Sequence, residues 1–243
     1  MKKNRGFFIT GTDTEVGKTL VSGALILKLR DAGINAVGFK PVVAGTYPNE
    51  SGEHLNEDLE TLRIASQLQA GQHSLCPYIL DQPAAPHIVA KAAGMTLSSK
   101  IILTAFNDIA SQFDCTIVEG AGGFLVPLNA QEDLGDIAQL INLPVILVIG
   151  MRLGCINHAL LSYEAIKARH LPVAGWVANT LSTEMPLLHA NLQTLKDRIA
   201  APYLGLIPPL PGDLQKHDNA PYSAEALRFA AAHFNLNAPE EVH

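Results

Sequence analysis

Short, continuously apolar segments that alternate with helix-like segments constrain the fold of this chain most strongly. Strands of a parallel sheet are buried on both faces, so they read as unbroken apolar runs. The pattern therefore predicts an α/β fold, with a mostly parallel central sheet and helices on both faces, as a single domain over residues 1–243. The expected strands are 6–10, 35–43, 115–119, 145–149, 173–178 and 203–207, and the expected helices are 18–32, 58–68, 98–113, 157–169, 186–199 and 223–234.

Composition and charge limit the kinds of binding partner and the cellular location to be expected. The 243 residues carry 17 Lys and Arg against 23 Asp and Glu, for a net charge of -6 and no basic stripe, so nucleic acid is not an expected partner. The apolar run after the basic N-terminus stops at Thr10-Gly11, and no later run has the length of a membrane span. Three cysteines without metal-ligand spacing favour a reduced, cytoplasmic location, and the lack of a span-length apolar run argues against a membrane partner.

The segment from Gly11 to Thr19 carries the clearest chemical signal. It reads Gly-Thr-Asp-Thr-Glu-Val-Gly-Lys-Thr, follows an apolar strand and opens a helix, which is the context of a Walker A phosphate loop. Backbone N–H groups and the helix N-terminus attract phosphate, Lys18 reaches the β- and γ-phosphates, and the Thr19 hydroxyl ligates Mg²⁺. Five residues rather than four separate Gly11 from Gly17. The loop predicts nucleoside triphosphate binding on a P-loop NTPase-like fold; the alternative is a glycine turn before a helix.

Polar residues at other strand ends are the next candidates, because ligands of open parallel sheets bind beyond the carboxyl ends of the strands. Lys40 lies near the end of the second expected strand, either as an active-site cation or as an exposed lysine before a proline turn. Glu119 ends a buried strand and is a natural ligand for the Mg²⁺ of Thr19, with the small residues Gly120 to Gly122 allowing a ligand to approach closely. Asp58 opens a helix, as its cap or as a ligand.

Two later strand ends leave alternatives open. Gly154 to Asn157 starts a helix whose N–H groups either hold a carboxylate or are merely capped. Asn179-Thr180 offers an amide that reads a base edge. Cys155 lies at a helix start that lowers a thiol pKa, but no general base is near it in sequence, so nucleophilic catalysis is not expected. The polar stretches 49–56 and 213–219 are expected to be exposed loops.

A set of motifs in one order resembles a known family over nearly the whole chain. They are Gly11 to Thr19, Lys40-Pro41-Val42, Pro77-Tyr78, Pro86-His87, Val118 to Gly123, Pro144 to Val148, Leu153 to His158 and Gly175 to Asn179. Together they resemble the ATP-dependent dethiobiotin synthetases; the tail beyond Gly212 matches weakly. The resemblance implies an ATP-dependent ligase that converts 7,8-diaminononanoate, CO₂ and ATP into dethiobiotin, ADP and phosphate, through a carbamate that ATP phosphorylates.

The resemblance also implies a role for each candidate. Lys40 and Lys18 are the catalytic cations, on the carbamate and the β/γ-phosphates respectively. Thr19, Asp58 and Glu119 surround Mg²⁺, and the substrate carboxylate docks on the N–H groups of a partner subunit, in a homodimer whose active site crosses the interface. The implied nucleotide contacts are Glu15, Val16, Gly17, Lys18, Thr19, Leu20, Asp58, Glu119, Gly120, Ala121, Gly122, Asn179, Thr180, Pro208, Pro209 and Leu210, and the implied substrate contacts are Lys40, Ala44, Thr46, Gly154, Cys155, Ile156 and Asn157.

Two positions depart from the family pattern. Ala44 replaces a frequent serine, so a hydroxyl contact to the substrate is lost or Thr46 supplies it. Arg152 replaces a common lysine, which keeps the charge but exchanges a point charge for a planar fork.

Other classes of ATPase share this kind of loop. A switch or assembly ATPase of the same fold is the alternative, but the loop lacks the early lysine of the partitioning and septum-positioning ATPases. An amide-forming enzyme of corrinoid acids normally carries an additional amidotransferase domain, for which 243 residues leave no room.

Overall fold

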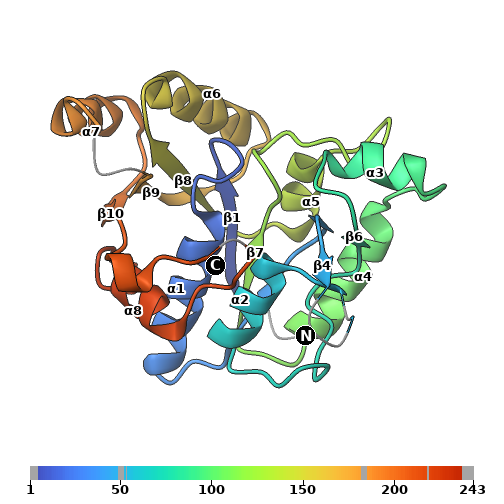
Figure 1. The fold of residues 1–243 in the computed structure, drawn as a ribbon. Helices are drawn as coiled ribbons and strands as arrows, with labels where there is room; N and C mark the ends of the chain where they lie inside the picture. Colours follow the sequence, from blue (N-terminus) through green and yellow to red (C-terminus); the bar gives the residue numbers. More distant parts are fainter. Residues whose placement is uncertain (1–4, 49–51, 53, 182–184, 218, 237–243) are drawn as a thin grey trace.

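A six-stranded sheet of order β10-β9-β8-β1-β7-β2 forms the centre of the molecule (Figure 1). All five neighbouring pairs in it are parallel, so the carboxyl ends of the six strands share one edge. The computed structural model describes residues 5–48, 52, 54–181, 185–217 and 219–236. The strands of the sheet are β1 (Gly6–Gly11), β2 (Ala36–Phe39), β7 (Cys115–Glu119), β8 (Val145–Met151), β9 (Val173–Thr180) and β10 (Tyr203–Ile207).

Helices cover both faces of the sheet, as the sequence pattern predicts. Helices α1, α2 and α8 pack against one another, α4 packs against α5, and α6 packs against α7. Strands β1, β7 and β8 are fully buried along their length because they lie between these layers. The helices are α1 (Lys18–Asp31), α2 (Glu57–Ala65), α3 (Pro86–Ala92), α4 (Ser99–Ala110), α5 (Leu134–Ile141), α6 (Cys155–Ala168), α7 (Leu188–Arg198) and α8 (Ala224–Ala231), with a 3₁₀ turn, η1, at Gly212–Leu214.

Two small ribbons stand apart from the central sheet. Strand β3 (Val43–Ala44) pairs in parallel with β6 (Ile79–Leu80), and β4 (Tyr47–Pro48) pairs in antiparallel with β5 (His54–Leu55). Both come from the connection between β2 and β7, which therefore builds a side wall next to the carboxyl edge of the sheet (Figure 1).

The structure corrects several expected boundaries. The second strand was expected to reach residue 43, but β2 ends at Phe39, because Lys40 donates its backbone N–H to Leu75 instead of to the sheet and Pro41 has no N–H. The seventh helix begins at Leu188, so Pro186 precedes it rather than lying in its first turn.

Two helices were missed. Helix α3 starts with a proline at its first position, and α5 starts with a capping box between Asp133 and Asp136. Both starts are recognisable local signals.

The expected loops are confirmed only in part. Residues 49, 50, 51 and 53 of the first, and 218 of the second, lie outside the described residues. Asn56 is buried rather than exposed, because its side chain caps α2. Around η1 the chain is mostly exposed, as expected.

None of the helices in the described part of the chain combines the length and the apolar character needed to cross a membrane.

Candidate active site

Strand register explains why Lys40 and Glu119 meet. Phe39 of β2 pairs with Val118 of β7, so the next residues, Lys40 and Glu119, leave adjacent strands side by side. Lys40 Nζ lies 2.6 Å from Glu119 Oε1 and 2.7 Å from Asp58 Oδ2. Lys40 is therefore a buried cation held between two carboxylates rather than an exposed lysine before a turn.

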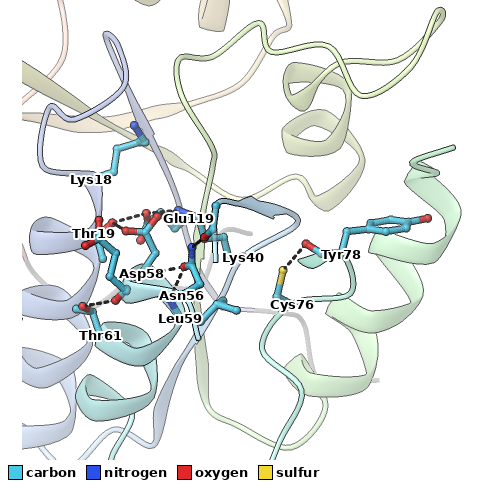
Figure 2. Close-up of polar contacts among 12 residues, drawn as sticks. Lys18, Thr19, Lys40, Asn56, Asp58, Leu59, Thr61, Cys76, Tyr78 and Glu119 are labelled. Carbon is cyan, nitrogen blue, oxygen red and sulfur yellow. Dashed lines mark hydrogen bonds and ion pairs between the residues drawn. The ribbon is translucent and has the colours of Figure 1, made fainter. Parts of the chain in front are cut away.

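The Thr19 hydroxyl joins the same carboxylates from the phosphate loop. Its Oγ1 lies 2.7 Å from Asp58 Oδ1 and 2.8 Å from Glu119 Oε1 (Figure 2). A hydroxyl has one proton, so it donates to only one of these oxygens at a time. The three residues that the family resemblance assigns to Mg²⁺ thus lie together, although their positions in the sequence span a hundred residues.

The electrostatics of the cluster follow from its burial. Burial alone would lower the pKa of Lys40, but Asp58 and Glu119 outweigh it and raise that pKa above its ordinary value, so Lys40 stays charged. Burial would likewise raise the pKa of Asp58, whereas Lys40 and the hydrogen bonds lower it to about 2. The pKa of Glu119 is raised, because burial outweighs the opposing effect of Lys40 and the Asp58 charge adds to it.

The donor set fits a divalent cation. Glu119 Oε2 is buried and has no hydrogen-bond partner among the described residues. Two carboxylates with a hydroxyl are the hard oxygen ligands that Mg²⁺ takes, usually with water and phosphate completing its shell. Within the described ranges no three His, Cys, Asp or Glu side chains form a metal-binding group, so the protein alone supplies an incomplete shell. Lys40 and a cation would compete for the same carboxylate oxygens.

Lys18 lies apart from this cluster, toward its own loop (Figure 2). Its Nζ donates to the Asp13 carbonyl at 2.9 Å. Burial, followed by the charge of Lys40, lowers the pKa of Lys18 from 10.5 to about 8. Asp13 also forms an ion pair with Arg152, which lies between β8 and α6. Asp13, which the sequence analysis did not assign a role, therefore connects the phosphate loop to the segment before α6.

Two residues of the phosphate loop have a left-handed backbone. Gly17 has φ 92 and Glu15 has φ 58, both in the left-handed region that L side chains rarely adopt. Such backbone strain persists where surrounding structure enforces it, often at ligand sites. Asn179 Nδ2 donates to the Val16 carbonyl at 2.9 Å, and a Cβ built on Gly17 would lie 2.1 Å from the same nitrogen. The Asn179 amide donor therefore supports the loop, and a role in reading the base stays a prediction.

The remaining expected contacts lie along the carboxyl edge. Gly120, Ala121 and Gly122 follow Glu119, with the Gly120 N–H donating to the Ile9 carbonyl. Thr180 ends β9 with a buried hydroxyl that has no partner among the described residues, and Pro208 to Leu210 follow β10. No contact ties these later residues into the Lys40 cluster in the described parts of the chain.

The start of α6 already uses one of its backbone donors, because the Cys155 N–H donates to the Arg152 carbonyl at 3.0 Å. Gly154 is the N-cap residue with φ 93, no side chain in the described part of the chain caps the helix, and Gly154 and Asn157 are exposed. The expectation for Cys155 was wrong: burial raises its pKa, and the backbone N–H groups at the helix start only oppose that rise. Ala44 ends β3, and Thr46 Oγ1 donates to Asp81 Oδ1 at 3.1 Å, so its hydroxyl already has a partner.

Asn56 is the site residue that the sequence analysis missed. Its Oδ1 accepts hydrogen bonds from the N–H groups of Asp58 and Leu59, and its Nδ2 donates to the Gly45 carbonyl. An asparagine directly before an acidic helix start is an N-cap signal that would have found it.

Comparisons with known proteins point to one family. A family model described as an AAA domain matches residues 5–216. An ATP-dependent dethiobiotin synthetase of Aromatoleum aromaticum is 49% identical over 87% of this chain and 94% of its own length, and one of Ralstonia nicotianae is 48% identical over 84% and 89%. Among solved structures, the cell division ATPase MinD of Pyrococcus furiosus matches with a TM-score of 0.54 at 16% identity, over 94% of this chain and 97% of its own; this likeness shows the fold alone. The carboxylate–lysine cluster beside a phosphate loop, together with these relatives, establishes that the chain belongs to the ATP-dependent dethiobiotin synthetase family.

Proposed function

We propose that this chain closes the ureido ring of dethiobiotin from 7,8-diaminononanoate, CO₂ and ATP. Its family makes it an ATP-dependent ligase of biotin biosynthesis that forms a C–N bond. The observation that carries the detailed proposal is the buried Lys40 ammonium between Asp58 and Glu119, next to a phosphate loop. A fixed cation there suits a reaction in which two anions, a carbamate and a γ-phosphate, must meet.

The reaction divides into three bond-forming steps. One substrate amine attacks the carbon of CO₂ and loses a proton, which gives a carbamate. A carbamate oxygen attacks the γ-phosphorus while the bond to ADP breaks, which gives a mixed anhydride. The second amine attacks the anhydride carbonyl and loses a proton, phosphate leaves, and the ring is closed. Positioning and charge neutralisation supply most of the catalysis.

Each residue of the cluster takes a part in this scheme. Lys18 neutralises the β- and γ-phosphates, and Lys40 neutralises the carbamate and the transferring phosphoryl group. Thr19, Asp58 and Glu119 would hold Mg²⁺, which lowers the charge repulsion between the phosphates and the attacking carbamate. The orphaned Glu119 Oε2 supports this assignment.

The nucleotide and substrate pockets complete the proposal. Glu15 to Leu20, Gly120 to Gly122, Asn179, Thr180 and Pro208 to Leu210 would contact ATP, and Ala44, Thr46 and Gly154 to Asn157 would contact the diamine. The start of α6, where Gly154 and Asn157 are exposed and no described side chain caps the helix, is suited to a carboxylate.

We further propose that the chain folds as one domain and forms a homodimer with the active site at the interface. We also propose that it works in the cytoplasm. Leu153, immediately before the proposed carboxylate site, is 99% exposed, which supports a partner surface at this point. The cysteines Cys76, Cys115 and Cys155 are free and buried, as suits a reducing compartment.

The test is ADP release with each substrate omitted in turn. We expect Mg²⁺-dependent ADP formation that requires both the diamine and bicarbonate. ADP formed at the same rate without the diamine would refute the proposed reaction.

A further inference from the structure

The Asn56 carboxamide connects two elements of the site. It is 8% exposed and lies beside Asp58 and Leu59 at the start of α2 (Figure 2). Its Oδ1 accepts from the Asp58 N–H at 3.0 Å and from the Leu59 N–H at 3.2 Å. Its Nδ2 donates to the Gly45 carbonyl at 2.7 Å. Both halves of the amide are therefore used, on opposite sides.

On the first side, the contact fixes the backbone that carries Asp58. The N–H that Asn56 accepts belongs to Asp58 itself, whose carboxylate contacts Lys40 at 2.7 Å and Thr19 at 2.7 Å. A shift of this helix start would move the carboxylate relative to the Lys40 ammonium and the phosphate loop.

On the second side, the contact fixes the segment that follows Lys40. Gly45 donates its N–H to the Leu80 carbonyl at 2.8 Å, and its own carbonyl accepts a hydrogen bond from Asn56 Nδ2. Both backbone polar groups of Gly45 are therefore hydrogen-bonded. Gly45 has φ 93, and a Cβ there would lie 3.1 Å from Pro83, so a side chain at this position would be strained. Its neighbours Ala44 and Thr46 are the residues proposed to face the diamine.

Capping alone does not require asparagine. Serine and aspartate cap helices about as well, because a cap needs only an acceptor. A side-chain amide is needed when one residue must accept on one side and donate on the other. The hydrogen bond that Asn56 Nδ2 donates to Gly45 is therefore the contact that requires asparagine here.

We propose that Asn56 is a positioning residue that holds the diamine-facing segment Ala44–Thr46 at a fixed distance from the Asp58 carboxylate. This inference rests on the proposed function, because it concerns the alignment of the carbamate with the phosphate. Asn56 touches neither reactant and acts through Gly45 and Asp58.

The decisive variant is Asn56→Ser, which keeps a neutral cap and removes the donor to Gly45. We expect the melting temperature and the Kd for nucleotide to stay near wild type, while kcat/KM for the diamine falls about tenfold, the effect of one lost buried hydrogen bond. Asn56→Asp keeps the cap as well and places a carboxylate oxygen against the Gly45 carbonyl, so a larger fall is expected. Should Asn56→Ser be unstable, Asn56→Asp decides the same question.

Ser223→Ala is the matched control. Ser223 caps α8 by accepting from the Ala226 N–H at 3.1 Å, outside the site. Its loss is expected to lower the melting temperature without changing kinetics for the diamine.

The outcomes separate the inference from the proposed function. Wild-type diamine kinetics in both cap-retaining variants would overturn the role of Asn56, and so would a parallel loss of nucleotide affinity, which indicates general loosening. A wild-type protein without diamine-dependent ADP release would instead refute the reaction itself, whatever the variants do.

Discussion

Lys40 and Glu119 form a buried ion pair, with Nζ 2.6 Å from Oε1 and side chains that are 3% and 0% exposed. Withdrawing two charges from water is costly, and such pairs are weak evidence for stability. Their place at the ends of β2 and β7, beside a phosphate loop, supports the proposal that the pair belongs to a site that handles anions.

Removing the Lys40 ammonium is expected to stop catalysis while nucleotide still binds. Lys40→Ala should lower turnover about 100- to 1000-fold, the usual cost of losing one transition-state donor. It should also destabilise the fold by about 3–5 kcal/mol, because two carboxylates lose their buried partner. Steady-state rates, calorimetric ADP binding and thermal melting measure the three effects. Lys40→Arg keeps the positive charge, so relative to Lys40→Ala it should restore more of the stability than of the turnover. Wild-type turnover in Lys40→Ala would refute the role assigned to Lys40.

The Thr19 hydroxyl is expected to make nucleotide binding depend on Mg²⁺. Thr19→Val keeps the shape of the side chain and removes the oxygen that lies near Asp58 and Glu119. Titrations of ADP with Mg²⁺ and with a chelator should then give similar Kd values, whereas wild type binds more tightly with Mg²⁺. Thr10→Val is the control, since the buried Thr10 hydroxyl has no partner within the residues that the structure describes. An unchanged Mg²⁺ effect in Thr19→Val would remove Thr19 from the proposed metal site.

Gly17 is expected to tolerate no side chain. In Gly17→Ala the new Cβ would meet Asn179 Nδ2 at 2.1 Å and break the support of the loop, so nucleotide affinity should be lost. Gly33→Ala imposes a similar left-handed backbone, φ +84, but meets nothing within 4 Å. It should cost stability, about 1 kcal/mol, and leave nucleotide binding intact. Equal effects of the two variants on ADP affinity would contradict this account of the loop.

Leu153 is expected to belong to the subunit interface. Leu153→Asp places a charge on a side chain that is 99% exposed, so any loss it causes arises from association rather than from folding. Light scattering over a dilution series should show a weakened dimer and activity that falls with it. Ile88→Asp, at a 57% exposed position of α3, is the control. Full activity from a verified monomer would overturn the cross-subunit carboxylate site.

The sequence alone predicted the class of fold and the chemistry-bearing strand ends. Lys40 and Glu119 were found because continuous apolar strands imply a parallel sheet, whose carboxyl ends meet at one edge. The missed helices α5 and α3 have 8 and 7 residues, which is too short for a clear hydrophobic period. In the sequence, only the residues at their N-termini indicate them. The end of β2 was misjudged because the partner of the Lys40 N–H, Leu75, is distant in sequence.

Contacts between side chains were the harder part. That Lys40 lies against Asp58 depends on how α2 packs on the sheet, which no local pattern encodes. Likewise, the expectation of a lowered pKa for Cys155 neglected burial, whose effect on the pKa outweighs that of the backbone hydrogen bonds at the helix start. The double use of the Asn56 amide became visible only with its two partners in place.

Product identification tests the central claim most directly. The protein is incubated with 7,8-diaminononanoate, ¹³C-bicarbonate and Mg-ATP, and the products are identified by mass spectrometry. The account predicts a labelled product that has gained one carbon and one oxygen and lost two hydrogens relative to the diamine, formed in equal amount with ADP. ADP formation with the diamine recovered unchanged would contradict it.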